Sequence, residues 1–225
     1  MKNYRVLIIY YSFTHQVKSQ LKKFREGLES EGVQVAFEQL VPLEAYHFPF
    51  RSNLQLMRAM VKTFFRRRMA IQPISEQCYE SWDLIVLAGP TWSYNPSGPM
   101  LSFLDNYAEK VCQGKKVLPF ISCRAYWRYH CRQLEKQLHL IGAQVEPPIV
   151  FEHPAREPWR FIGLVLQLRG MIGKKIHSLL KRKYPSYGHN QEQRVAALEY
   201  GKRVAARLAG KVESEADRYG HCPEM

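Results

Sequence analysis

The sequence predicts an α/β protein built on a parallel β-sheet, and two observations carry this prediction. Residues 6–11 and 84–88 are continuous apolar runs without polar alternation. Such runs are typical of parallel strands that are covered on both faces. Each run is followed by a loop and then by apolar residues at helical spacing, so strands and helices alternate along the chain. The 225 residues are enough for one well-buried domain.

The strands and helices can be placed in order from these patterns. After the first strand, Val17, Leu21 and Phe24 mark one face of a helix that ends near Gly32. The alternating residues 33–37 predict a second, more peripheral strand. Three further strands are predicted at 84–88, 117–121 and 145–151, the last near the sheet edge because it contains Pro147 and Pro148. Three further helices are predicted over about 100–111, 127–142 and 190–209.

Two longer segments, about 42–81 and 154–185, interrupt this alternation. Each mixes apolar residues with many Lys and Arg, and the first includes a predicted helix over about 54–69. We interpret both as basic amphipathic insertions over the mouth of the sheet, suited to a lipid headgroup or a hydrophobic substrate. The alternative is helices that pack on the sheet with their basic faces in water. The predicted organisation is one domain over 1–210 and a flexible tail over 211–225.

The charge and the cysteines restrict the environment and the partners. Thirty-three Lys and Arg against 20 Asp and Glu give a net charge of +13, which favours a phosphorylated cofactor, a lipid surface or nucleic acid, or else is a solvated basic face. Nucleic-acid binding is disfavoured because the basic residues carry no recognition motif. Five cysteines without paired or zinc spacing, and no signal peptide, predict a cytoplasmic protein without a bound metal.

Polar or aromatic loops follow three of the predicted strands. Ser12 and Thr14 precede a helix N-terminus, where free backbone N–H groups favour a phosphate, although a simple helix cap is the alternative. Trp92 and Tyr94 offer flat faces in the loop over 89–99, which suits a planar ring. The third loop covers 122–127. Because ligands of open parallel sheets bind beyond the carboxyl ends of the strands, these loops form the candidate site.

These loops resemble those of the flavodoxin-like superfamily. Residues 11–17, Tyr-Ser-Phe-Thr-His-Gln-Val, are similar to the family's phosphate loop S-x-T-G-N-T, with His15, Gln16 and Val17 in place of Gly, Asn and Thr. Residues 88–92 and the Phe-Leu-Asp at 103–105 resemble its second loop, which flanks the isoalloxazine. The resemblance implies a doubly wound five-stranded sheet of order 2-1-3-4-5 with helices on both faces. It also implies FMN as cofactor, with NAD(P)H as a candidate electron donor.

A more specific resemblance is to the flavodoxin-like dialkylresorcinol-condensing enzymes. It rests on Tyr-Ser before the first loop, on Thr91-Trp92 with Asn95-Pro96-Ser97, and on Cys123-Arg124 followed by Trp127. The resemblance implies aromatisation of a cyclic diketone that bears alkyl chains. The residues then expected to bind the cofactor are Ser12, Thr14, His15, Gln16, Val17, Pro90, Thr91, Trp92, Ser93, Tyr94, Asn95, Ser122, Cys123, Arg124 and Trp127.

Three residues are the candidates for chemistry. Arg124 would stabilise the reduced, anionic flavin and raise its two-electron potential, or else form a structural ion pair. Tyr126 or His130 would exchange a proton with a substrate enol. Cys123 is either a nucleophile or, as the more frequent case, a buried apolar residue at a strand end.

The predicted function is an FMN-dependent oxidoreductase acting on a hydrophobic quinone, cyclic diketone or resorcinol. The alternatives are a flavodoxin-like electron carrier, which the two insertions argue against, and a flavin-free binding protein, which His15 and Val17 favour. The predicted partners are a small hydrophobic substrate and, at the periphery, an anionic membrane at its inner face; a homodimer is a candidate assembly.

Overall fold

A computed structural model describes residues 3–171 and 190–211. The predicted tail beyond residue 211 and residues 172–185 of the second insertion lie outside the described residues. The sheet is parallel and has the order β2-β1-β3-β5-β6, with β7 also paired to β5. The strands are β1 (Arg5–Tyr10), β2 (Gln34–Gln39), β3 (Leu84–Trp92), β5 (Lys116–Cys123), β6 (Gln144–Val145) and β7 (Ile149–Glu152). The predicted order 2-1-3-4-5 is therefore confirmed, with β5 as the fourth strand.

Two regions depart from uniform parallel pairing. The predicted fifth strand is interrupted between Val145 and Ile149, where the two prolines lie, so it forms the separate segments β6 and β7. Both segments pair in parallel with β5. The end of β3 pairs in antiparallel fashion with β4 (Asn95–Pro96), so the second loop is a short hairpin rather than an irregular loop.

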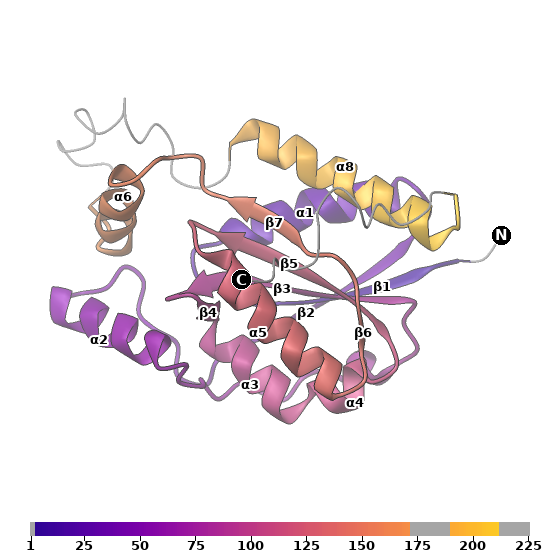
Figure 1. The fold of residues 1–225 in the computed structure, drawn as a ribbon, viewed down its shortest axis with the longest axis horizontal. Coiled ribbons are helices and arrows are strands. Elements are labelled where there is room, and N and C mark those ends of the chain that lie inside the picture. Colours follow the sequence, from indigo (N-terminus) through magenta and orange to yellow (C-terminus); the bar gives the residue numbers. More distant parts are fainter. Residues whose placement is uncertain (1–2, 172–189, 212–225) are drawn as a thin grey trace.

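Helices cover both faces of the sheet (Figure 1). One face packs on α1 (Gln16–Glu29) and α8 (Gln191–Leu208), and the other on α3 (Gly98–Asn106), α4 (Ala108–Cys112) and α5 (Trp127–Leu140). The β1 side chains alternate between these two layers: Val6 and Ile8 pack toward α1, and Leu7 and Ile9 toward α3. Burial on both faces explains why these strands are continuous apolar runs.

The two helices on the first face approach closely at a pair of glycines. A Cβ on Gly27 would overlap the carbonyl oxygen of Leu198, and a Cβ on Gly201 would overlap the carbonyl oxygen of Phe24. The helix backbones are therefore in direct contact, and only glycine fits at these two positions. Asn190 begins α8 with a capping box, in which its side chain accepts from Gln193 N and the Gln193 side chain accepts from Asn190 N.

Two predicted helices differ from the observed ones. The helix expected over 54–69 is α2 (Asn53–Phe64), which ends before Arg66, a residue in the left-handed region with φ 53°. The prediction was too long because apolar and basic residues continue beyond Phe65, where the chain turns away. The helix expected over 100–111 breaks at Tyr107 into α3 and α4.

The insertions place α2 and α6 (Trp159–Leu168) beyond the carboxyl ends of the strands, at the left of Figure 1. They meet through a small apolar cluster that includes Leu56 and Ala59 of α2 and Val165 and Leu168 of α6. A backbone hydrogen bond from Phe50 N to Leu168 O, 2.8 Å long, joins the two insertions. Among the described residues, no helix combines the length and apolarity needed to cross a bilayer.

Candidate functional site

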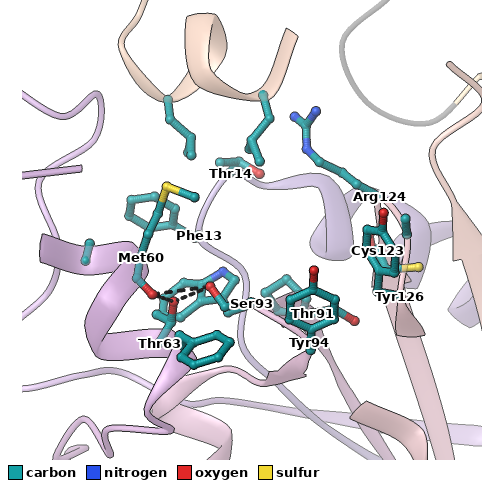
Figure 2. Close-up of a pocket in the computed structure, with 18 of the residues that line it drawn as sticks. Phe13, Thr14, Met60, Thr63, Thr91, Ser93, Tyr94, Cys123, Arg124 and Tyr126 are labelled. Carbon is teal, nitrogen blue, oxygen red and sulfur yellow. Dashed lines mark hydrogen bonds between the residues drawn. The ribbon is translucent and has the colours of Figure 1, made fainter. Parts of the chain in front are cut away.

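A cavity of about 510 Å³ opens at the carboxyl edge of the sheet. Figure 2 shows residues of the three predicted loops around it, together with Met60 and Thr63 of α2. Its volume lies within the range of about 300–1,000 Å³ that is usual for small-molecule sites. The three loops therefore form part of the cavity wall, and the two insertions form the rest of it.

The first loop, residues 12–17, presents a row of unused backbone donors. Within the described chain, none of the backbone N–H groups of residues 13–17 forms a hydrogen bond. The next N–H, of Lys18, donates to Ser12 Oγ at 3.4 Å. Ser12 and Thr14 both line the cavity. Unused N–H groups at the start of a helix, together with the helix dipole, make an anion site.

His15 adopts the backbone conformation that this loop needs. It is the N-cap of α1 with φ 59° and ψ 1°, in the left-handed region, and its side chain makes no capping hydrogen bond. This is the position at which the resembled loop has glycine, so the turn is kept despite the Cβ. Val17, at the position of a threonine, is buried and packs into the core between β1 and α1.

Trp92 in the second loop is packed from several sides by aromatic rings. Tyr11 and Phe13 meet it edge-on, with ring centroids 5.4 and 5.8 Å away, and Tyr46 lies at 5.9 Å. Trp92 is therefore held by the protein itself, although it lines the cavity. Tyr46 comes from the first insertion and packs on part of the ring, so Trp92 is half-buried and only part of its surface is open to the cavity.

The second loop is tied to the end of α2 by polar side chains. Asn95 Nδ2 donates to the carbonyl oxygens of Thr63 and Phe64, each at 3.3 Å, and so caps that helix. Ser93 Oγ and Thr63 Oγ1 share a hydrogen bond of 2.8 Å, drawn in Figure 2. Asn95 is buried and does not line the cavity, and its Nδ2 also donates to Ser93 O within the loop at 2.8 Å.

The exposed flat faces of the site belong to Tyr94 and Tyr126. Their ring centroids are 5.0 Å apart and their planes are inclined by 54°. Tyr94 is 44% exposed and Tyr126 60%, so both rings have free surface toward solvent and the cavity. A planar ligand at this edge would stack on one of these rings or lie between them after a small separation.

Backbone strain is concentrated in the same loops. Among the described residues, the non-glycine positions with positive φ are His15, Arg66, Ser93, Tyr94 and Tyr126. All but Arg66 lie in the three loops. Such conformations cost about 1–3 kcal/mol each and cluster at functional sites, where the surrounding structure holds them. This clustering is independent support for the cavity as the functional site.

The third loop brings Cys123 and Arg124 to the cavity wall. Arg124 Nη1 donates to the carbonyl oxygen of Arg160 at 2.8 Å, which links this loop to α6. Burial raises the pKa of the Cys123 thiol well above its usual range. Cys123 therefore stays protonated at neutral pH, and of the two alternatives for this residue the buried apolar role fits the structure.

His130 lies behind the cavity rather than in it. It is 2% exposed, and its Nδ1 forms a 2.9 Å hydrogen bond with Thr91 Oγ1, which does line the cavity. Burial lowers the pKa of His130 to about 3, so the imidazole is neutral at physiological pH. His130 thus orients the Thr91 hydroxyl, while direct proton exchange between His130 and a ligand would require the ligand to enter the core.

The cavity brings together most of the sequence-predicted site residues. It is lined by Ser12, Thr14, Gln16, Val17, Pro90, Thr91, Trp92, Ser93, Tyr94, Ser122, Cys123, Arg124 and Tyr126. Four predicted residues do not line it: His15, Asn95, Trp127 and His130. Trp127 instead packs against Ile121, Cys123 and Cys131.

Most of the rest of the cavity wall is apolar and comes from the insertions. These side chains include Tyr46, Phe50, Leu56, Ala59, Met60, Phe64, Phe161, Leu164 and Leu168, and Phe13 of the first loop lies among them. Glu157 and Arg160 are the charged residues there that the sequence reasoning missed. Arg160 Nε donates to the carbonyl oxygen of Ala155 at 2.6 Å. No spacing pattern in the sequence indicated Arg160. It lies at the cavity because of the position of α6, which begins at Trp159.

The residues present fit FMN, the cofactor that the resemblance implies. The unused N–H groups of the first loop, with Ser12 and Thr14, supply donors for a phosphate. Tyr94 and Tyr126 supply ring faces, and Arg124 supplies a cation next to them on the third loop. Beyond these loops, under α2 and α6, the cavity is lined by apolar side chains.

Comparisons with known proteins support the fold. No protein-family model matches the sequence, and no curated protein matches it significantly. Among solved structures, a flavodoxin from the domain Archaea has a TM-score of 0.53 at 13% identity, over 91% of this chain and 99% of that one. A flavoprotein from Lactobacillus acidophilus in complex with FMN has a TM-score of 0.51 at 19% identity, over 65% and 92%.

The flavodiiron protein of Giardia intestinalis is a third similar structure, with a TM-score of 0.52 at 12% identity over 92% of this chain and 36% of that one. At these identities the similarity concerns the fold. Together with the observed strand order, it shows that this protein has a flavodoxin-like α/β fold.

Proposed function

We propose that this protein is an FMN-dependent oxidoreductase whose substrate is a quinone or cyclic diketone bearing an alkyl chain. One observation carries the proposal: a single cavity joins an anion-binding loop and exposed tyrosines to an apolar chamber beneath α2 and α6. A flavodoxin-like electron carrier needs the first half of this cavity only. The apolar half is therefore suited to a second, apolar ligand.

The two halves of the cavity have different tasks. When bound, FMN would supply two-electron transfer between a donor such as NAD(P)H and the substrate. Ser12, Thr14 and the N–H groups of residues 13–17 would hold the phosphate. Leu164 and Met60 would hold the alkyl chain and exclude water from the reacting ring.

Two side chains where these halves meet are suited to interact with polar atoms of the substrate. Arg124 lies on the third loop and would stabilise negative charge that develops on a ring oxygen. Tyr126 is exposed to the cavity and its hydroxyl would hold a proton for a substrate oxygen. His130 would act through Thr91, as a positioning residue.

The proposal is tested by reoxidation of the chemically reduced, FMN-loaded protein with two quinones that share one ring, one with a decyl tail and one without. The tailed quinone is expected to react at least about tenfold faster at equal subsaturating concentration, because burial of each methylene contributes about 0.8 kcal/mol. The measurement is the anaerobic rate at which the absorbance of oxidised flavin returns.

A matched pair of variants locates the effect. Leu164→Asn should remove most of the advantage of the tailed quinone and leave the tail-free rate unchanged, since Leu164 lines the apolar half. Leu140→Asn, at the exposed end of α5, should change neither rate. Equal rates for the two quinones with the unmodified protein would contradict the proposed substrate class and favour an electron carrier.

A flavin-free binding protein on the same fold is the second candidate. Two observations favour it: Val17 offers no hydroxyl to a phosphate, and the Tyr94 and Tyr126 rings already touch. On this account the cavity would bind the apolar ligand alone. The quinone with the decyl tail would then bind while FMN would not.

A further inference from the structure

The outward face of α2 is apolar, although nothing in the described structure covers it. Leu54, Met57, Val61 and Phe64 follow one another at spacings of three and four residues, so they share one helix face. Their side chains are 59, 57, 51 and 57% exposed. The adjoining Phe65 is 75% exposed. We call these five residues the outer stripe.

The opposite face of the same helix is already used. Leu56 and Ala59 are the buried residues of α2, and they pack against Phe50 and the end of α6. A surface helix of a globular protein has one apolar face and one polar face. Because α2 has a second apolar face that its own fold does not need, the outer stripe requires another explanation.

Cations surround the outer stripe and acidic groups are missing from it. Residues 45–69 contain six Lys or Arg and no Asp or Glu. Arg58 and Lys62 are exposed and lie beside the stripe on α2, and Arg51 and Arg67 are exposed at its two ends. Arg68 differs, since it is paired with Asp105 at 2.6 Å. An apolar helix face bordered by cations is the pattern of a helix that lies in the interface of an anionic bilayer.

The outer stripe is continuous with the mouth of the cavity. Val61, Phe64 and Phe65 are exposed and also line the cavity. Across the mouth, Phe161 of α6 is 52% exposed and lines the cavity as well. Figure 1 shows α2 and α6 together at one end of the molecule, beyond the sheet. One flat surface could therefore contact both helices while the cavity opens toward it.

A second copy of the chain is a less suitable occupant. A twofold contact would place the stripe, with Arg58 and Lys62, against the same residues of the other copy. Like charges would then meet at the rim, in a chain whose net charge is already +13. An anionic lipid surface instead supplies opposite charge to the same cations.

We infer that the outer stripe of α2, with Arg58 and Lys62, docks this protein on an anionic membrane and directs the cavity mouth to the lipid. An apolar ligand dissolved in the bilayer would enter the cavity between α2 and α6 without crossing water. The docking itself does not depend on FMN, and the delivery of a ligand rests on the function proposed above.

The test is sedimentation of the full-length protein with vesicles of phosphatidylcholine alone or of phosphatidylcholine mixed with phosphatidylglycerol. Binding to the anionic vesicles is expected to be at least about tenfold stronger, because each cation near the surface contributes about fivefold. Molar salt should reduce this difference. Leu54→Asp/Met57→Asp and Arg58→Glu/Lys62→Glu should each weaken binding to anionic vesicles at least about tenfold.

Matched controls carry the same changes on other surfaces. Leu140→Asp/Val195→Asp replaces two exposed apolar residues of α5 and α8, and Lys22→Glu/Lys136→Glu reverses two exposed cations on α1 and α5. Both controls should bind vesicles like the unmodified protein. Unchanged thermal unfolding of the α2 variants shows that they are folded, and none of their four positions lines the cavity.

Three outcomes would overturn the inference. The α2 variants could bind anionic vesicles as tightly as their controls, or the unmodified protein could bind both vesicle types equally. Alternatively, the protein could ignore vesicles and form a dimer that Leu54→Asp/Met57→Asp dissociates, which would make the stripe an interface between copies. FMN binding measured without vesicles is a separate result, so failure of docking is distinguishable from failure of the proposed function.

Discussion

Replacing Thr14 by glutamate is expected to weaken FMN binding at least about 100-fold. Thr14 lines the cavity in the first loop, beside backbone N–H groups that have no partner in the described chain. A carboxylate there would accept from these groups itself and would repel the phosphate. Two unit charges of the same sign 4 Å apart repel by about 4 kcal/mol near a protein surface, which exceeds the 2.7 kcal/mol that a 100-fold change needs.

Two controls separate the effect of the glutamate charge from the effect of the larger side chain. Thr14→Gln has the size of the glutamate variant without its charge and should lose less than about tenfold. Riboflavin lacks the phosphate, so its weaker binding should be the same in Thr14→Glu and in the unmodified protein. Fluorescence titration measures the five dissociation constants, three for FMN and two for riboflavin. If Thr14→Glu bound FMN as tightly as the unmodified protein, the first loop would not be the phosphate site.

Replacing Gly201 by alanine is expected to lower the free energy of unfolding by at least about 2 kcal/mol. The added Cβ would overlap the carbonyl oxygen of Phe24 and approach the Leu28 amide, which are backbone atoms of α1 that cannot rotate away. The two helices would have to separate, and the core residues Ala197, Val204 and Ala205 of α8 would lose packing. Urea unfolding followed by circular dichroism measures the effect.

Helix propensity alone predicts a stability change of the opposite sign for Gly201→Ala. Alanine in a helix interior is about 1 kcal/mol more favourable than glycine, so without the close contact Gly201→Ala would stabilise the protein. Val195→Ala, at an exposed position of the same helix, is the control and should change stability little. A Gly201→Ala protein as stable as the unmodified one would show that α1 and α8 do not meet as closely as described.

The buried strands were predictable from the sequence because burial on both faces leaves continuous apolar runs, as in Val6–Tyr11 and Leu84–Ala88. Their order came from the resemblance of the loops to the flavodoxin-like superfamily. Helix ends were less predictable, since they depend on distant groups. The α2 helix ends at Phe64. There the side chain of Asn95, some thirty residues later in the sequence, donates hydrogen bonds to the last carbonyl oxygens of the helix. No sequence pattern within residues 54–69 indicates that contact.

The candidate site was predictable in its location and less so in its side chains. The three loops lie at one edge of the sheet because parallel strands bring their carboxyl ends together. The direction of each aromatic ring depends on tertiary packing: Trp92 is held by Tyr11 and Phe13, while Trp127 packs against Cys123 and Cys131 and does not line the cavity. Arg160 faces the cavity only through the position of α6.

The most direct test of the account is the absorbance spectrum of the purified protein, desalted before and after incubation with FMN. Flavin bands are expected to remain with the protein after the second desalting, at about one FMN per chain, and to be lost in Thr14→Glu. A protein that retains no flavin, and that does not change the fluorescence of added FMN, would contradict the account and leave the cavity as the site of an apolar ligand alone.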